Sequence, residues 1–363
     1  MAPDANQIRL LQELITSTGT QLAEYIAILT PGAAIPALPH TDNPPHPLHV
    51  LRDAAQLVKA HTTKLGLLAI NAPFTPSAVR GVLSELATTC IPAMMSASHI
   101  CHQQRAVWGA VMAAESQARV RRVFRELEML LDELRAVARE SSGGGGNGSA
   151  GRRDSLSSTG VVWESCDAVV ELARLDVAGL AVQKAEQWRD TIKDAIEELR
   201  EWKEGEDLDS EGLDELLDDG DEGVEGDRDS IEDIFNAANS MPKDRPELKK
   251  LVDDVDGKLK KVVLLYTAVI KRRLKIFKVE ESDGGAQANI KRLDKTLHSL
   301  RRVPNQVDDL ASCFYDLDEE RVKQALSKCI DEAISTATTV QRNWQDTEDE
   351  FTTWSGKWKE AMS

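Results

Sequence analysis

The sequence predicts an all-α protein built as two antiparallel helical bundles with an acidic insert between them. Three observations lead to this fold class. Apolar residues recur every three or four positions along most of the 363 residues, which is the period of a helix with one buried face. Aromatic residues make up only 4% of the chain, which favours helices over sheets. No segment of the sequence shows the strict alternation of a strand followed by a hairpin turn.

The N-terminal helical bundle is predicted to occupy residues 1–140. Its apolar stripes indicate helices over residues 4–29, 51–72 and 98–139. A further helix is expected to begin at Thr75-Pro76. There the threonine hydroxyl would cap the helix, and proline would take the first helical position. Pro92 is expected to end or kink this helix, because proline lacks the N–H that a helix interior needs.

Residues 141–158 are rich in glycine and serine, with the run GGGGNGSAG at their centre. They have too little apolar surface to offset the cost of ordering them, so we predict a Gly/Ser linker. Ser155 follows the paired residues Arg152 and Arg153. This makes Ser155 a candidate phosphorylation site for a basophilic kinase, and an ordinary polar linker is the alternative.

A long helix is predicted for residues 159–203, because two apolar stripes follow one another there. Gly179 lies between the stripes and is expected to mark a bend or a short break. The sequence leaves open whether this helix completes the N-terminal bundle or is shared between both bundles.

Residues 204–233 form the acidic insert and are predicted to be disordered. They hold sixteen acidic residues against one arginine, which accounts for −15 of the formal net charge of −17 and leaves about −2 for the rest. Such a segment has little to bury. The spacing from Asp221 to Glu232 fits a calcium-binding loop only in part. We therefore favour a solvated acidic linker over a calcium site.

The C-terminal helical bundle is predicted for residues 234–363. It is expected to start at the capping pair Asp244-x-x-Glu247. One of its helices is expected to end before Pro304, and a last long helix should run from about Asp318 towards the C-terminus. The basic run 271–275, Lys-Arg-Arg-Leu-Lys, could be a nuclear-import patch or a nucleic-acid contact. We favour the interpretation that these are solvated residues near a helix C-terminus, where they complement the helix dipole.

The tryptophans are interpreted by their place on these stripes. Trp163, Trp188 and Trp202 are expected in the core. Trp344, Trp354 and Trp358 could cap the second bundle or present an aromatic face to a partner. The core reading is favoured for all three, and the partner reading stays open.

No reactive constellation emerges from the sequence. The pair His99 and His102 surrounds Cys101, but no second cluster supplies the remaining ligands that a zinc site needs. We find no phosphate-binding loop, nucleophile elbow or dinucleotide fingerprint. We therefore expect a protein that is not an enzyme and that has no catalytic residues, no cofactor and no metal.

Charge and hydropathy exclude further classes. The chain lacks the clustered positive charge that marks nucleic-acid binding, so no direct DNA binding is expected. No stretch reaches the roughly 20 apolar residues of a membrane span, so no membrane insertion is expected. The five cysteines are scattered without a short Cys-x-x-Cys, which is typical of reduced thiols. We expect a cytoplasmic and nuclear location.

Three segments together carry a resemblance to a known family. They are residues 159–172 (TGVVWESCDAVVEL), 192–202 (IKDAIEELREW) and 305–318 (NQVDDLASCFYDLD), the last followed by a long helix. In this order they resemble the cyclin-D-binding protein family, also called the GCIP family, of which the chain looks like a fungal-type member. The resemblance implies two helical bundles similar to those of vinculin and catenin.

The same resemblance implies a function. It implies a regulator of cell-cycle progression that acts through protein–protein binding, with cyclin-type or helix-loop-helix-type regulators as partners. The family defines no binding residues that could be carried over to this chain. A vinculin/catenin-like structural or cytoskeletal adaptor bundle is the alternative.

Overall fold

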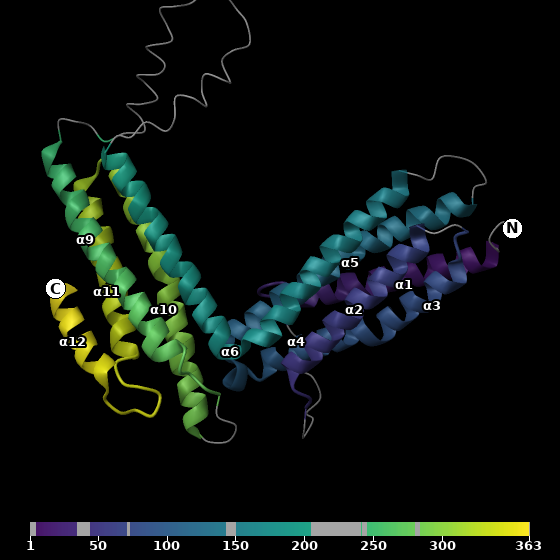
Figure 1. Cartoon of the computed structure of the whole chain (residues 1–363), viewed down its shortest axis with the longest axis horizontal. Coiled ribbons are helices and arrows are strands. Elements are labelled where there is room, and N and C mark those ends of the chain that lie inside the picture. Colours follow the sequence, from purple (N-terminus) through teal and green to yellow (C-terminus); the bar gives the residue numbers. More distant parts are fainter. Residues whose placement is uncertain are drawn as a thin grey trace, which may run out of the picture. The chain divides into compact units, whose positions relative to one another are not determined.

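The computed structural model describes residues 5–34, 44–70, 73–142, 150–204, 241, 245–279 and 284–362, with residues 141–142, 150–157 and 284–285 described by their backbone alone. Within these ranges the secondary structure is helical, and no strand occurs (Figure 1). The predicted all-α fold class is confirmed. The acidic insert, residues 204–233, lies outside the described residues except for Glu204.

The elements follow one another along the chain, with two single-turn π-helices labelled η. They are α1 (Ala5–Ile28), α2 (Pro47–Ile70), α3 (Pro76–Glu85), η1 (Leu86–Cys90), α4 (Ile91–Gln103), α5 (Arg105–Ser142), α6 (Ala150–Glu204), α9 (Pro246–Val269), η2 (Ile270–Leu274), α10 (Gly284–Tyr315), α11 (Glu319–Thr339) and α12 (Glu350–Met362).

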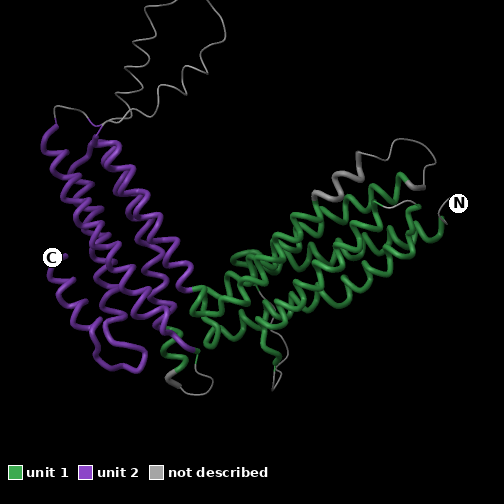
Figure 2. The backbone as a smooth tube through the Cα atoms, viewed as in Figure 1, with its two compact units in different colours: residues 1–180, 279–291 green, residues 181–278, 292–363 purple. Residues whose placement is uncertain are grey.

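The chain divides into two compact units, drawn in different colours in Figure 2. Unit 1 comprises residues 1–180 and 279–291, and unit 2 comprises residues 181–278 and 292–363. One division falls between Leu180 and Ala181, inside α6. Residues 159–203, whose assignment the sequence leaves open, therefore contribute to both units.

Unit 1 has a core of side chains from α1 to α5 and the first part of α6. The predicted stripe of α1 is buried at Ile8, Leu11, Ile15 and Leu22. Thr18 interrupts that stripe and is also buried, because its hydroxyl donates to the Leu14 carbonyl at 2.8 Å. An ion pair between Lys59 of α2 and Asp167 of α6, at 2.6 Å, lies at the edge of this core.

Unit 2 is built from the second part of α6 with α9, α10, α11 and α12. Helices α9 and α11 run parallel. Two hydrogen bonds show this, since one joins the starts of the two helices and the other joins their ends. Arg245 donates to the Leu317 carbonyl at 3.5 Å near the start of both helices. Arg273 donates to the Val340 carbonyl at 2.7 Å near their ends. Helix α12 lies beside α9 and α11 (Figure 1).

The prediction that a helix ends before Pro304 is wrong. Helix α10 continues through Pro304, from Gly284 to Tyr315. Proline has no N–H to donate to the carbonyl four residues earlier, which belongs to Leu300. The buried hydroxyl of Tyr266, on α9, donates to that carbonyl at 2.5 Å instead. A tertiary contact thus satisfies the acceptor that the proline leaves open.

Two long helices contain a single residue with non-helical backbone angles. In α5 it is Gly109, with φ 79° and ψ 158°. In α6 it is Asp176, with φ 59° and ψ −175°, three residues before Gly179, where the sequence predicts a bend or break. The predicted helix over residues 98–139 is in fact divided between α4 and α5.

The predicted helix starts are met only in part. The backbone is already helical from Ala150, within the predicted linker. Pro76 takes the first position of α3 as predicted, but the Thr75 hydroxyl makes no cap bond and donates to the Pro73 carbonyl. Helix α9 begins at Pro246 behind Arg245, and Asp244 of the predicted capping pair lies outside the described residues.

Candidate functional site

Arg273 in η2 is fully buried and makes several hydrogen bonds within unit 2. Its guanidinium donates to the carbonyls of Val340 (2.7 Å) and Gln341 (2.9 Å). It also makes a two-pronged contact with the Asp349 carboxylate at 2.8 and 2.9 Å, the geometry in which arginine binds carboxylates most strongly. The guanidinium carbon lies 4.3 Å from the centre of the Phe351 ring.

This finding corrects the interpretation of the basic run 271–275. Lys271, Arg272 and Lys275 are exposed, as expected, but Arg273 is not. Its carbonyl also accepts a hydrogen bond from the Trp344 indole at 2.7 Å. Arg273 thus fastens the connection between α11 and α12 to the end of α9.

Asp349 is the partner that compensates this buried charge. The hydrogen bond from Arg273 is the largest cause that lowers the pKa of Asp349 below its ordinary value. Asp349 also begins α12, because its carboxylate accepts from the Thr352 N–H while the Thr352 hydroxyl accepts from the Asp349 N–H, each at 3.1 Å. Such a reciprocal pair satisfies N–H groups that a helix start leaves open.

The break before α12 corrects the prediction of one last helix running from Asp318 towards the C-terminus. Helix α11 begins behind Asp318 as predicted, with the Asp318 side chain accepting from the Arg321 N–H, but it ends at Thr339. The Asp349-x-x-Thr352 pattern is the signal in the sequence that could have located the second start.

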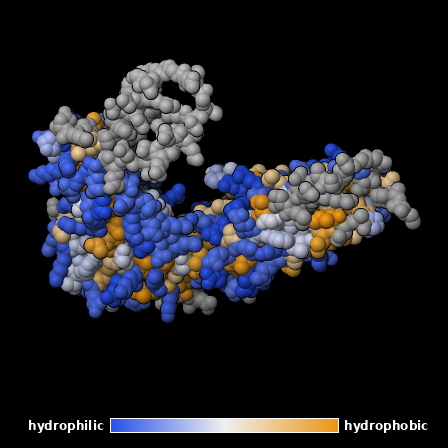
Figure 3. Space-filling view, turned by 45° about the horizontal axis from the view of Figure 1, so that its top comes forward, coloured by the Kyte–Doolittle hydropathy of each residue, from blue (hydrophilic) through white to orange (hydrophobic). Residues whose placement is uncertain are grey.

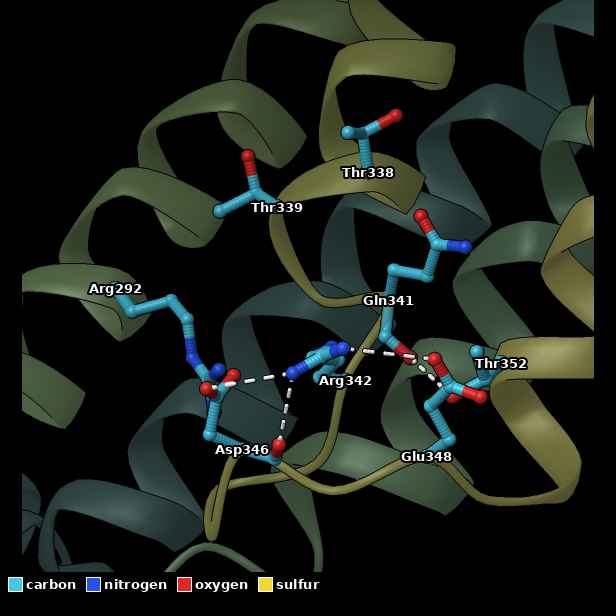
Figure 4. Close-up of a pocket in the computed structure, with 8 residues that line it drawn as sticks. All are labelled: Arg292, Thr338, Thr339, Gln341, Arg342, Asp346, Glu348 and Thr352. Carbon is cyan, nitrogen blue, oxygen red and sulfur yellow. Dashed lines mark hydrogen bonds and ion pairs between the residues drawn. The ribbon is translucent and has the colours of Figure 1, made fainter.

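A polar cavity of about 420 Å³ adjoins this connection (Figure 4). Its lining is mixed in charge and is formed by Arg292, Thr338, Thr339, Gln341, Arg342, Asp346, Glu348 and Thr352. Figure 4 shows Arg342 between Asp346 and Glu348, with 3.5 Å between the guanidinium nitrogen and the carboxylate oxygen in both ion pairs. The charges of the cavity thus largely balance one another.

Arg292 of α10 is the distinctive side chain of this cavity. It donates to the Asn343 carbonyl at 2.6 Å and stacks on Trp344, with 4.5 Å from the guanidinium carbon to the ring centre. Desolvation lowers the pKa of Arg292. The hydroxyls of Thr338 and Thr339 donate to helix carbonyls, so neither is arranged as an activated nucleophile.

The His/Cys cluster predicted not to bind metal lies in α4. His99 and Cys101 are buried. The Nδ1 atom of His102 lies 2.8 Å from Arg105 and 3.1 Å from Gln117. Burial raises the pKa of the Cys101 thiol to about 12, which is typical of an unreactive buried thiol. Among the described residues, no group of three or more potential ligands is arranged to hold a metal ion.

The remaining candidate residues are less informative. Ser155 lies in the helical backbone of α6, and its side chain is outside the described residues. Trp202 is buried as predicted, whereas Trp163 and Trp188 are half-buried. Of the three C-terminal tryptophans, Trp344 and Trp358 are buried and Trp354 is half-buried.

Exposed apolar side chains are scattered rather than gathered. They include Leu57 and Leu67 on α2, Met129 on α5 and Leu264 on α9. On the face that Figure 3 shows, apolar residues form small patches interrupted by hydrophilic ones. Single exposed apolar residues are normal for a protein surface and do not by themselves mark an interface.

Comparison with known proteins decides the family. The model of the family described as "Grap2 and cyclin-D-interacting, N-terminal" matches residues 50–205. The model of its C-terminal counterpart matches residues 216–335. The chain belongs to this family. The matched residues begin after α1 and end before Asp349 and α12.

A relative of this chain occurs in the fission yeast Schizosaccharomyces pombe. It is described as an uncharacterized protein and is 24% identical over 318 residues, which cover 86% of this chain and 83% of the relative. Family membership supports a role in protein interaction. Among the described residues, no helix combines the length and the apolar character that crossing a membrane would need.

Proposed function

We propose that this protein is a non-enzymatic helical interaction protein that regulates cell-cycle progression by binding other proteins. Membership of the Grap2 and cyclin-D-interacting family is the observation that carries the proposal. Its partners would be cyclin-type or helix-loop-helix-type regulators. The protein would act without a cofactor, in the cytoplasm and the nucleus, and without direct contact to DNA.

The described surface agrees with such a role. The cavity around Arg292 is polar and charge-balanced, and its threonine hydroxyls are engaged with helix carbonyls. Long helices with one buried stripe instead offer faces on which a partner helix can pack. Recognition of a helix by a helix is therefore the mode of action that this architecture favours.

Affinity capture of the tagged full chain, followed by mass spectrometry, tests the proposal. We expect cyclins, their kinases or transcription regulators among the specifically recovered proteins. Recovery of actin or cell-junction proteins in their place would contradict the regulatory role and support a structural adaptor of the vinculin/catenin kind.

A second measurement addresses the cell cycle itself. If the protein slows progression, its removal should shorten the interval before DNA synthesis, and its overproduction should lengthen it. Flow cytometry of DNA content measures both changes. An unchanged distribution in both strains, with the protein level verified, would contradict a regulatory role in the cell cycle.

A further inference from the structure

Helix α12 has the pattern of a short helix bound on a complementary face. Its buried residues Phe351, Ser355, Trp358 and Met362 follow one another at intervals of four, three and four. This is the spacing by which amphipathic helices insert anchors into a partner. Two of the anchors are large aromatic side chains, which dominate the energetics of such contacts.

Helices α9 and α12 are also joined by hydrogen bonds. Lys258 and Lys261 donate to the carbonyls of Met362 (2.6 Å) and Ala361 (2.8 Å), the last carbonyls of α12. The Trp358 indole donates to the Lys261 carbonyl at 2.9 Å. These bonds satisfy acceptors that the end of a helix leaves open, and they place positive charge where the helix dipole favours it.

An apolar residue of α9 lies on the side of this contact. Leu265 is fully buried and, three residues after Val262, lies at the edge of the core stripe of α9. It comes seven residues after Lys258 and four after Lys261, the two lysines that contact α12. Leu265 therefore lies on the side of α9 against which α12 packs.

The direction of α12 determines how far it reaches. Asp349, just before α12, contacts Arg273 beyond the end of α9, whereas Met362 contacts Lys258. Helix α12 therefore runs antiparallel to α9 and stops at Lys258. Twelve residues of α9 precede Lys258, from Pro246 onward, a length of about 18 Å.

Apolar side chains continue along this remaining part. Leu251 lies seven residues before Lys258, on the same side of α9, and is half-buried. On the parallel helix α11, Leu326, Ile330 and Ile334 are half-buried and follow each other at intervals of four. The next residue of that row, Thr338, lines the same cavity as Thr352 of α12.

These residues define what we call the α9–α11 face: Leu251, Lys258 and Leu265 of α9, with Leu326, Ile330 and Ile334 of α11. We propose that the α9–α11 face binds an amphipathic helix of a partner protein, and that α12 is a built-in competitor for one half of it. This inference rests on the proposed interaction function and adds the surface and the kind of partner.

The contacts of α12 specify the partner. Its helix should begin with acidic residues, because Asp349 and Glu350 meet Arg273 and Arg272 at this end. Aromatic or large aliphatic anchors should follow at intervals of three and four. The helix should have about 25 residues, the length of α12 plus the part of α9 that α12 does not reach.

The greater length has a physical reason. A tethered helix competes at an effective concentration in the millimolar range, so a partner of equal length would rarely displace it. Additional contacts with Leu251, Leu326 and Ile330 would give a longer helix the necessary advantage. The second half of the α9–α11 face thus supplies the affinity that displacement requires.

The test uses the full chain and a fluorescent peptide with the sequence of residues 346–363 as the probe. In the wild-type chain the tethered α12 should keep the peptide out. In a release variant, F351A/W358A, the peptide should bind at least ten-fold more tightly, as measured by fluorescence anisotropy. The matched control T353A/K357A alters two exposed residues of α12 and should behave like the wild type.

Two further variants connect the binding to the α9–α11 face. Adding Leu265→Asp to the release variant should abolish peptide binding. Should that variant fail to fold, Arg272→Glu serves instead, because Arg272 is about half-exposed. It should weaken the peptide several-fold, and a peptide carrying Glu350→Lys should restore the affinity.

The outcomes separate this inference from the proposed function. Equal peptide affinity for wild type and a folded release variant would overturn the inference even if cyclins are captured. Dimerisation of the release variant without peptide, seen by analytical ultracentrifugation, would overturn it in favour of a second copy on this face. A regulator that is captured with the wild-type chain should be recovered in several-fold larger amount with the release variant. If the release variant no longer captures this regulator, the inference is likewise overturned.

Discussion

Tyr266 and Pro304 form a pair at the scale of single residues. The hydroxyl of Tyr266 donates to the Leu300 carbonyl. Pro304 cannot donate to this carbonyl, because proline has no N–H. We expect Tyr266→Phe to lower the free energy of unfolding by about 1–3 kcal/mol, because a buried carbonyl then has no donor. Urea denaturation followed by circular dichroism measures the change.

The partner substitution makes this prediction specific. Pro304→Ala restores an N–H that can donate to the Leu300 carbonyl within α10. The double variant Y266F/P304A should therefore be more stable than Y266F alone, and a double-mutant cycle measures the coupling. Strict additivity of the two effects would show that the two residues do not share this acceptor.

Asp349 makes stability depend on acid pH. Its pKa is lowered in the folded protein, chiefly by the hydrogen bond from Arg273, and the pKa of an aspartate in an unfolded chain is about 3.9. The unfolded chain therefore binds more protons between these two pKa values, and stability rises with pH there. The contribution is complete above about pH 4 and is lost as the pH falls through the folded pKa.

The variant Asp349→Asn tests this origin. It should lose stability at neutral pH, where the wild type keeps the full charged contact with the buried Arg273. Below pH 4 the difference between the two chains should shrink. Unfolding free energies measured between pH 2.5 and 7 provide the comparison, and a constant difference across that range would argue against the Arg273 contact as its cause.

The contacts of Arg273 also show what sequence patterns miss at this scale. The run 271–275 contains four basic residues, and its local pattern indicates a solvated helix end. The groups that bury Arg273 lie 67 to 76 residues later in the chain. Nothing in the local sequence carries that information, so the candidate site around Arg273 could not be predicted.

Elements were predicted better than single contacts. The 3.6-residue period is strong over long stripes, so the helices from α1 to α11 were largely anticipated. Their boundaries depend on partners distant in sequence, as Pro304 shows, and these boundaries were often wrong. The gap between α11 and α12 was missed because Trp344 and Phe351 extend the apolar pattern across it.

The break in α6 allows a prediction at the scale of this element. Asp176 has φ 59° and ψ −175°, a region that costs an L-amino acid about 1–3 kcal/mol. Its carboxylate accepts from the Val177 N–H at 2.6 Å. Asp176→Ala keeps the strain and loses this bond, whereas Asp176→Gly relieves the strain. We expect the glycine variant to be the more stable of the two by about 1 kcal/mol.

A matched position in the same helix provides the control. Asp194 is exposed and lies in the regular part of α6, where alanine should be more stable than glycine by about 1 kcal/mol. Thermal unfolding of the four variants decides the matter. If alanine exceeds glycine at both positions, the backbone at Asp176 is not strained.

At the scale of the whole molecule, charge and fold are separated along the chain. The insert carries most of the negative charge, whereas the described units are held by apolar stripes and a few fixed contacts such as those of Arg273 and α12. The acidic overall composition therefore describes a segment, and the candidate interaction surfaces belong to a nearly neutral scaffold.

This separation leads to a prediction for the insert. Deleting residues 206–229 removes thirteen acidic residues and one arginine from a segment whose composition offers little apolar surface to bury. The melting temperature measured by differential scanning calorimetry should change by no more than about 2 °C, less than the roughly 2–4 °C that a 1 kcal/mol loss would cause in a domain of this size.

A control variant replaces the same residues by a Gly/Ser segment of equal length. If the melting temperature drops by many degrees in the deletion and equally in this control, the acidic side chains themselves stabilise a unit. A drop in the deletion alone would place the requirement on the length of the connection, because α6 and α9 must still pair through Arg200 and Asp256.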